Sequence, residues 1–168
     1  MKPVVSIIMG STSDLSIMDR AAKVFDEFEI PFEMYALSAH RTPEEVESFA
    51  KNAKVKGIEV IIAAAGMAAH LPGVIASMTA LPVIGVPINV SISGLDALLS
   101  IVQMPPGIPV ATVGINASMN AAILAIQILA VKDERLREKL AGYKEALKDK
   151  IVQANHELSS IHYKFKTN

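Results

Sequence analysis

Short apolar runs that alternate with helix-like segments are the feature that most limits how this chain can fold. The run Val4 to Met9 is followed, after a polar turn, by apolar residues at helical spacing from Leu15 to Phe28. The unit recurs, which predicts further strands at 32–37, 60–65, 82–86 and 109–113 and further helices at 43–56, 71–78, 95–102 and 118–129. Strands that are apolar on both faces and separated by helices indicate a parallel sheet covered on both sides. We therefore predict a three-layer α/β fold with strand order 2-1-3-4-5, since right-handed crossovers leave few arrangements.

The length and the end of the chain indicate one domain with a long terminal helix. At 168 residues, 1–168 is expected to form a single α/β domain, and no internal repeat beyond the strand–helix unit occurs. A charged segment opens at Asp133 and predicts a helix that runs to about Tyr163.

The middle of the chain carries almost no charge. Between Val60 and Val131 there is no Lys or Arg, and Asp96 is the only acidic residue. Either membrane helices or a core shared with other subunits would explain this. A spanning helix needs about 20 consecutive apolar residues, and Gly and Pro residues interrupt the stretch repeatedly. We therefore predict a homo-oligomer that buries these surfaces, and no membrane partner.

The composition excludes several classes of function. With 16 basic and 17 acidic residues, the chain has no charge excess suited to nucleic acid or to an anionic membrane. Without cysteine, it can form no disulfide and use no thiolate. The start, Met1-Lys2-Pro3, does not resemble a signal peptide, so we expect a cytoplasmic protein with a small-molecule or protein partner.

The predicted strand order places a ligand crevice between the loops after the first three strands. In the first loop, Ser11 and Ser13 bring hydroxyls and free backbone N–H groups to a helix start, which suits a phosphate. The alternative is that Ser13 or Asp14 caps its own helix. Asp14 is either an acid favoured by the helix dipole or an acceptor for ribose hydroxyls.

The second loop, Ser38-Ala39-His40-Arg41, carries the strongest catalytic candidate. Thr42 is the expected N-cap of the next helix, with Pro43 at its first position and Glu45 three residues after the cap. An imidazole that titrates near neutrality beside a permanent cation suits proton transfer on an anionic substrate. Arg41 is also placed to complete a phosphate clamp with the first loop.

Other candidates are weaker or absent. His70 lies in the apolar loop Gly66 to Gly73 and is either a core residue or part of the site. His40, His70, Asp14 and Asp96 show no metal-ligand spacing, so no metal is predicted. The chain also lacks a nucleophile elbow, a P-loop and a dinucleotide fingerprint. The stiff segment Met104 to Gly107 is a candidate lid over its own site or that of a neighbouring subunit.

Five motifs occur together in a characteristic order. They are Gly10-Ser11-x-Ser13-Asp14, Ser38-Ala39-His40-Arg41-Thr42-Pro43, Ala68-Ala69-His70-Leu71-Pro72-Gly73, Gly85-Val86-Pro87 and Ser100-Ile101-Val102-Gln103-Met104-Pro105. Over about Val4 to Leu129, the chain resembles the class I 5-(carboxyamino)imidazole ribonucleotide mutases of de novo purine (IMP) biosynthesis. The second and third motifs are the most specific.

The resemblance implies a flavodoxin-like fold, a homo-octamer in which the terminal helix takes part in packing, and an isomerase. The substrate would be a ribonucleotide whose carboxylate moves from the exocyclic nitrogen to carbon 4 of the imidazole, without metal, ATP or biotin. By the same resemblance, His40 is the general acid/base and Asp14 the ribose contact. The phosphate contacts are Ser11, Ser13, Ser38 and Arg41, and the carboxylate pocket is formed by Gly66 and His70.

Two positions depart from the family's G-A-G-G-A-A-H pattern, which reads Ala64-Ala65-Gly66-Met67-Ala68-Ala69-His70 here. Ala64 replaces the first glycine of this pattern, and the backbone tolerates this replacement if the φ of Ala64 is negative. Met67 replaces a glycine, which is often used for positive φ or close ligand approach, so it either narrows the pocket, alters the rate or faces a subunit contact.

Two further functions remain as alternatives. A class II aminoimidazole ribonucleotide carboxylase, which takes free carbon dioxide, typically has Lys in place of Arg41 and lacks the third motif. A flavin-binding protein would also use a Ser/Thr-rich turn, but this chain has no Trp and none of its three Tyr lies in the crevice loops.

Overall fold

The structure, a computed structural model, describes residues 1–168. The chain separates into two compact units, 1–129 and 130–168, which are described in turn. The first unit contains a five-stranded, all-parallel sheet in the order β2-β1-β3-β4-β5, as predicted. Its strands are β1 (Val5–Met9), β2 (Phe32–Ala36), β3 (Val60–Gly66), β4 (Val83–Ile88) and β5 (Ala111–Thr112).

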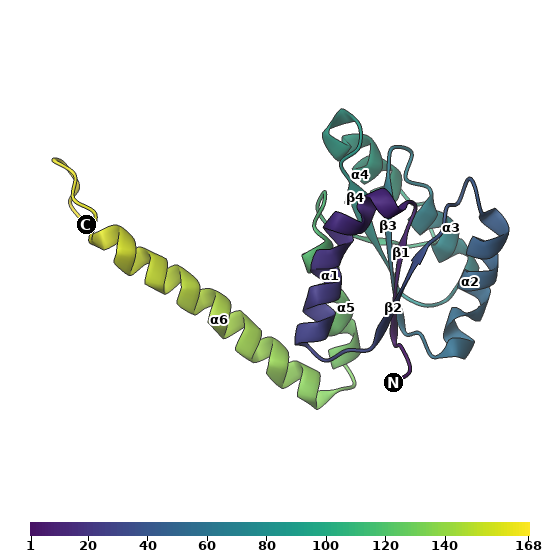
Figure 1. The fold of residues 1–168 in the computed structure, drawn as a ribbon, viewed down its shortest axis with the longest axis horizontal. Coiled ribbons are helices and arrows are strands. Elements are labelled where there is room, and N and C mark those ends of the chain that lie inside the picture. The colour runs from purple at the N-terminus through teal and green to yellow at the C-terminus, as the bar shows by residue number, and fades with distance from the viewer. The chain divides into compact units, whose positions relative to one another are not determined.

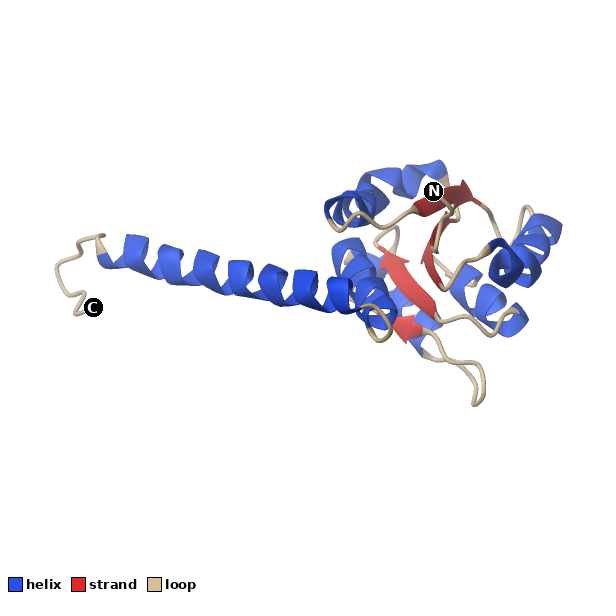
Figure 2. Cartoon of the chain, turned by 90° about the horizontal axis from the view of Figure 1, so that it is seen from below, coloured by secondary structure: helices blue, strands red, loops and turns tan.

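Helices cover both faces of this sheet (Figures 1 and 2). They are α1 (Leu15–Glu27), α2 (Pro43–Lys56), α3 (Leu71–Met78), α4 (Leu95–Val102) and α5 (Ser118–Ala130), with short 3-10 turns η1 (Thr12–Asp14) and η2 (Ile92–Gly94). Helices α1 and α5 lie on one face (Figure 1), where the Ser118 hydroxyl donates a hydrogen bond to the Ile17 carbonyl at 2.5 Å. Helices α2, α3 and α4 pack on the other face.

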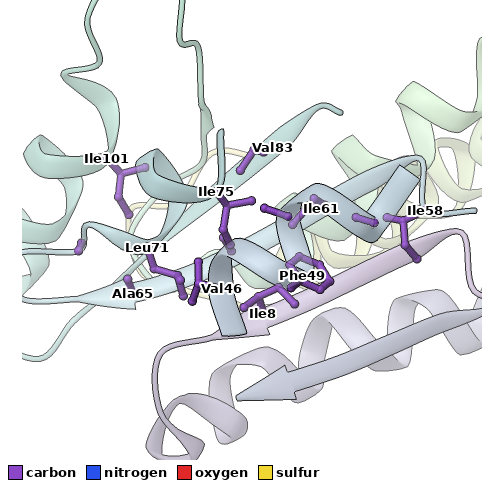
Figure 3. Close-up of a cluster of buried hydrophobic side chains, with 14 of the residues drawn as sticks. Ile8, Val46, Phe49, Ile58, Ile61, Ala65, Leu71, Ile75, Val83 and Ile101 are labelled. Carbon is purple, nitrogen blue, oxygen red and sulfur yellow. The ribbon is translucent and has the colours of Figure 1, made fainter. Parts of the chain in front are cut away.

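The second of these faces holds the cluster of buried side chains in Figure 3. Phe49 of α2, Ile75 of α3 and Ile101 of α4 meet Ile8 and Ile61 of the sheet there. Full burial of side chains of this size stabilises a fold by about 1.5–3 kcal/mol each. The alternation of side chains along β1 explains why Ile7 and Ile8 are both fully buried, since each faces a different helical layer.

Gly85 marks a close approach between β4 and α4. A Cβ atom at this position would lie 2.3 Å from Cγ2 of Ile101 and 3.0 Å from Cγ1 of Val110. Only glycine lets the helix pack this near the strand.

The strand register brings three loops to one edge of the sheet. Val5 pairs with Phe32 and Val60, and Met9 pairs with Ala36 and Ala64. Because β1, β2 and β3 are parallel and end at the same level, the loops that follow them meet at their carboxyl ends.

The helix bounds match the prediction closely, whereas the last two strands differ from it. β4 continues past the predicted Val86 to Ile88 and includes Pro87, which donates no hydrogen bond. It accommodates a proline because β5 pairs only with Ile84 and Gly85. β5 is limited to Ala111–Thr112, shorter than the predicted 109–113.

The second unit contains α6 (Glu134–Ser159). Asp133, where the sequence predicted that this helix opens, is its N-cap and accepts a hydrogen bond from the Leu136 N–H at 3.3 Å. Arg137 donates to the carbonyls of Ala130 and Val131. The helix ends at Ser159, so the predicted end near Tyr163 was wrong. None of the helices combines the length and the apolar character needed to cross a membrane.

Candidate active site

A cavity of about 490 Å³ lies where the loops after β1, β2 and β3 meet. This volume falls within the range of about 300–1,000 Å³ typical of small-molecule sites. Every site residue predicted from the sequence lines it, namely Ser11, Ser13, Asp14, Ser38, His40, Arg41, Gly66 and His70. The three loops therefore share one hollow, as the strand order predicted.

The first loop turns through η1 before α1 begins. The Ser11 hydroxyl accepts a hydrogen bond from the Ser13 N–H at 3.3 Å and so caps η1. The expectation that Ser13 or Asp14 caps its own helix was wrong, since Asp14 occupies the N-cap position of α1 without a side-chain cap bond. Instead, the Ser13 hydroxyl donates to Asp14 Oδ1 at 3.2 Å.

Asp14 is a buried acid on the wall of the cavity. Only 6% of it is exposed. Burial raises the pKa of the Asp14 carboxyl, and hydrogen bonds from the Ser13 side chain and the Ser11 backbone offset part of that rise. Burying this carboxyl in the cavity wall therefore lowers the stability of the fold when the group is charged. This favours a ligand-binding role for Asp14 over that of a solvated acid in the first turn of a helix.

The second loop is fixed by Thr42, although not in the predicted way. The Thr42 hydroxyl accepts a hydrogen bond from the Ser38 N–H at 2.9 Å and donates to the Ser38 carbonyl at 3.2 Å. Thr42 is the N-cap of α2 and Pro43 occupies the start of the helix, both as predicted, but the Thr42 hydroxyl makes no bond to the first turn. The two bonds close the loop that presents His40 and Arg41.

Arg41 joins the second loop to the first. Its Nη2 donates to the Gly10 carbonyl at 2.9 Å, and its backbone N–H donates to Ser38 Oγ at 3.2 Å. Its Nε lies 3.4 Å from the same hydroxyl. The guanidinium is thus already held beside the hydroxyls of the first loop, where an anion would gain charge-assisted hydrogen bonds.

His40 and His70 join the second loop to the third. His40 Nε2 lies 2.7 Å from His70 Nδ1, and the ring centroids are 4.9 Å apart in an edge-on arrangement. Both residues are exposed, so His70 is not a core residue, and the choice left open by the sequence resolves in favour of the cavity.

The third loop is a tight turn with an apolar surface. The Ala69 N–H donates to the Gly66 carbonyl at 3.0 Å, which places Met67 and Ala68 at the centre of the turn. Met67 has a φ of +55°. Ala64 is fully buried within β3 and is not among the residues with positive φ, so this departure from the family pattern is accommodated.

The cavity lining differs from the prediction at Val90 and at Met104. Val90, which follows β4, lines the cavity and was not predicted from the sequence. The predicted strand order could have identified Val90, because β4 lies next to β3 and the loop after β4 reaches the same edge of the sheet. Met104 packs against Gly73 and does not line the cavity, so within one chain it is not a lid.

The chemistry available in this cavity is that of two imidazoles, one guanidinium, one buried carboxyl and several hydroxyls. No group of three or more His, Cys, Asp or Glu side chains is arranged to hold a metal ion. Apart from His70, these polar groups lie on the first two loops, and the third loop otherwise supplies apolar side chains.

Comparison with known proteins places the chain in a family. The AIR carboxylase family model matches residues 4–150. The chain belongs to the AIR carboxylase family. This confirms the resemblance on which the sequence interpretation rested.

Individual members of the AIR carboxylase family are similar over most of their length. The chain is 60% identical over 147 residues to an N5-carboxyaminoimidazole ribonucleotide mutase from Pyrococcus abyssi, covering 87% of this chain and 84% of that one. It is 54% identical over 163 residues to the mutase from Thermotoga maritima, covering 96% and 95%. A crystal structure of a PurE2 variant from Treponema denticola aligns with a TM-score of 0.85 at 30% identity, covering 94% and 99%.

Proposed function

We propose that this chain is an N5-carboxyaminoimidazole ribonucleotide mutase, an isomerase of de novo purine biosynthesis. It would move the carboxylate from the exocyclic nitrogen to carbon 4, giving 5-amino-1-(5-phosphoribosyl)imidazole-4-carboxylate. The observation that carries the proposal is the contact of His40 with His70 in one cavity between an anion-suited loop and an apolar loop. The curated relatives at 54–60% identity, which are named as this mutase, support it.

In the proposed binding mode, the ribose 5-phosphate lies along the first two loops. Ser11, Ser13, Ser38 and Arg41 would contact the phosphate, since all four line the cavity and Arg41 already bonds to the first loop. Asp14 would accept hydrogen bonds from the ribose hydroxyls. The imidazole and its carboxylate would then lie toward Gly66 and His70.

The proposed reaction needs one proton to move in each direction. His40 donates a proton to the exocyclic nitrogen as its bond to the carboxyl carbon breaks, and carbon dioxide is released within the cavity. Carbon 4 then forms its bond to that carbon dioxide, and His40 takes the proton that carbon 4 loses. Atoms and charge balance without a co-reactant, so no cofactor is proposed.

The apolar third loop would hold the carbon dioxide until it recombines. Ala65 and Ala69 are nearly fully buried and contribute small apolar surfaces to the cavity wall. A water-poor pocket beside the general acid/base limits loss of the intermediate.

Turnover of the purified protein on the carboxyamino substrate, with no metal, nucleotide or biotin added, tests this function. We expect conversion to the 4-carboxylate above the rate of an enzyme-free blank. Absence of turnover would overturn the proposal.

The alternative carboxylase function is separated by supplying aminoimidazole ribonucleotide with labelled bicarbonate. Label incorporation as fast as mutase turnover would identify a class II carboxylase. A yellow protein with bound flavin would instead support the flavin-binding alternative. The identities to named mutases favour the main proposal over both.

We also propose that the chain assembles into a homo-oligomer, an octamer by its family resemblance, and that it acts in the cytoplasm, where purine precursors are made. The uncharged stretch leaves apolar side chains exposed on one helix, with Leu95, Leu99 and Val102 of α4 each about half exposed. Exposed apolar surface of this kind indicates a contact with another chain. Helix α6, which carries further exposed apolar residues, is proposed to take part in the packing.

A further inference from the structure

Met67 occupies a backbone position that glycine would adopt without strain. The Gly66–Ala69 hydrogen bond closes a four-residue turn with Met67 at its first central position, at a φ of +55°. Turns that require positive φ at that position are dominated by glycine. A long side chain is therefore retained where it strains the backbone, and strained residues concentrate at functional sites.

The Met67 side chain lies at the rim of the cavity rather than on its floor. It lines the cavity while remaining 58% exposed, whereas Ala65 and Ala69 are only 7% and 3% exposed. Next to it, Val90 packs on the Gly66 backbone so closely that a Cβ atom at Gly66 would lie 2.4 Å from Val90 Cγ2. Met67 and Val90 thus flank the apolar end of the cavity, and Met67 is the longer and more flexible of the two.

We propose that Met67 is the gate that retains carbon dioxide during the reaction. This inference rests on the proposed mutase function. Once the carboxyl carbon has left the exocyclic nitrogen, the carbon dioxide either bonds to carbon 4 or escapes to solvent. If it escapes, the net reaction takes up one proton from solvent and yields aminoimidazole ribonucleotide and carbon dioxide. The flexible Met67 side chain covers the apolar end of the cavity, so it slows this escape, and it changes rotamer to let substrate enter.

An isotope experiment measures retention directly. Substrate carrying a 13C-labelled carboxylate is mixed with enzyme in buffer containing unlabelled bicarbonate, for times short enough that an enzyme-free blank shows little exchange. The label retained in the 4-carboxylate product and the amount of aminoimidazole ribonucleotide formed beside it together give the ratio of escape to transfer. Both are compared among wild type, Met67→Gly, Met67→Ala and Met67→Leu. Val55→Ala, which shortens an exposed side chain on α2, is the control.

We expect wild type, Met67→Leu and Val55→Ala to retain the label to similar extents. In Met67→Gly and Met67→Ala, the ratio of escape to transfer should rise at least threefold. Met67→Gly relieves the strain at positive φ and so should fold at least as well as wild type, which a thermal melt checks.

The outcomes separate this inference from the proposed function. No turnover by wild type would overturn the mutase itself. Turnover with equal retention in wild type and Met67→Gly would overturn only the gate, as would a wild-type product that carries no label above the solvent value. Loss of label in Met67→Gly but not in Met67→Ala would assign the effect to the backbone and also overturn the gate.

Discussion

His40 Nε2 and His70 Nδ1 lie 2.7 Å apart, which is the contact that joins the two most characteristic loops of the chain. One of these nitrogens must donate a hydrogen and the other must accept it. The contact is compatible with a neutral pair or with one added proton, but two added protons would bring two donors face to face. The pair therefore has the capacity to store the single proton that the proposed reaction moves.

Replacing His40 tests its role as the general acid/base. His40→Asn should reduce kcat by at least about 10²-fold, because proton transfer by a positioned side chain contributes about 10²–10⁴. Substrate should still bind, as measured by calorimetry. His156→Asn on exposed α6 is the matched control and should keep wild-type activity. Near-normal turnover in His40→Asn would refute the assignment.

Replacing His70 tests the pair rather than the proton donor alone. His70→Asn should lower kcat less than His40→Asn does, because His40 keeps its imidazole but loses the partner that orients it. Binding of the substrate, measured by calorimetry, should change little in His70→Asn. Wild-type kcat in His70→Asn would show that His70 does not orient His40.

Replacing Arg41 tests the position of the phosphate. Arg41→Ala should weaken binding by about 1.5–3 kcal/mol, the range for hydrogen bonds to charged groups. The loss should appear with a phosphorylated ligand and vanish with its dephosphorylated counterpart, both measured by calorimetry. Arg20→Ala, on the exposed side of α1, is the control. Equal affinity in Arg41→Ala and wild type would place the phosphate elsewhere.

Replacing Asp14 tests whether a functional residue is kept at the expense of stability. Burial raises the pKa of Asp14 in the folded state, so the folded chain holds this proton more readily than the unfolded chain. The contribution of Asp14 to stability therefore increases as the pH falls through the raised pKa. Asp14→Asn should melt at a higher temperature than wild type at pH 7, while losing ligand affinity.

The advantage of Asp14→Asn should shrink as the pH is lowered, because wild-type Asp14 then becomes neutral as well. Thermal melts across this pH range measure the effect. Asp19→Asn, which removes an exposed carboxylate paired with Lys23 at 2.6 Å, should change the melting temperature little at any pH. A variant at position 14 that is less stable than wild type at pH 7 would contradict the argument.

The sequence predicted the elements that local patterns control. Helix α2 begins at Pro43 and ends before Gly57, whose φ of +100° explains the stop. The strand order and the meeting of three loops also followed from the apolar strands and the handedness of their connections. These features depend on periodicity and chirality, which a single sequence contains.

Features that depend on contacts distant in sequence were missed. Thr42 is the N-cap residue that the sequence predicted, but its hydroxyl bonds to Ser38 instead of the first turn of α2, because the loop brings the two residues together. Val90 carries no motif and reaches the cavity only because β4 lies beside β3. The fourth strand was predicted to end at Val86. β4 continues through Pro87, which has no N–H to donate, because β5 is short and pairs only with Ile84 and Gly85.

The apolar surface of α4 provides the last prediction. Leu95, Leu99 and Val102 are spaced by four and three residues and are 49%, 48% and 50% exposed, so they form one stripe on the helix. If this stripe is buried between copies of the chain, Leu99→Glu would place a charge in an apolar contact and reduce the mass of the assembly. Val55→Glu, at a position 87% exposed on the lysine-rich helix α2, introduces the same charge and should leave the assembly intact. Sedimentation velocity measures both, with circular dichroism to confirm folding. An assembly of wild-type mass in folded Leu99→Glu would show that this stripe is not buried between subunits.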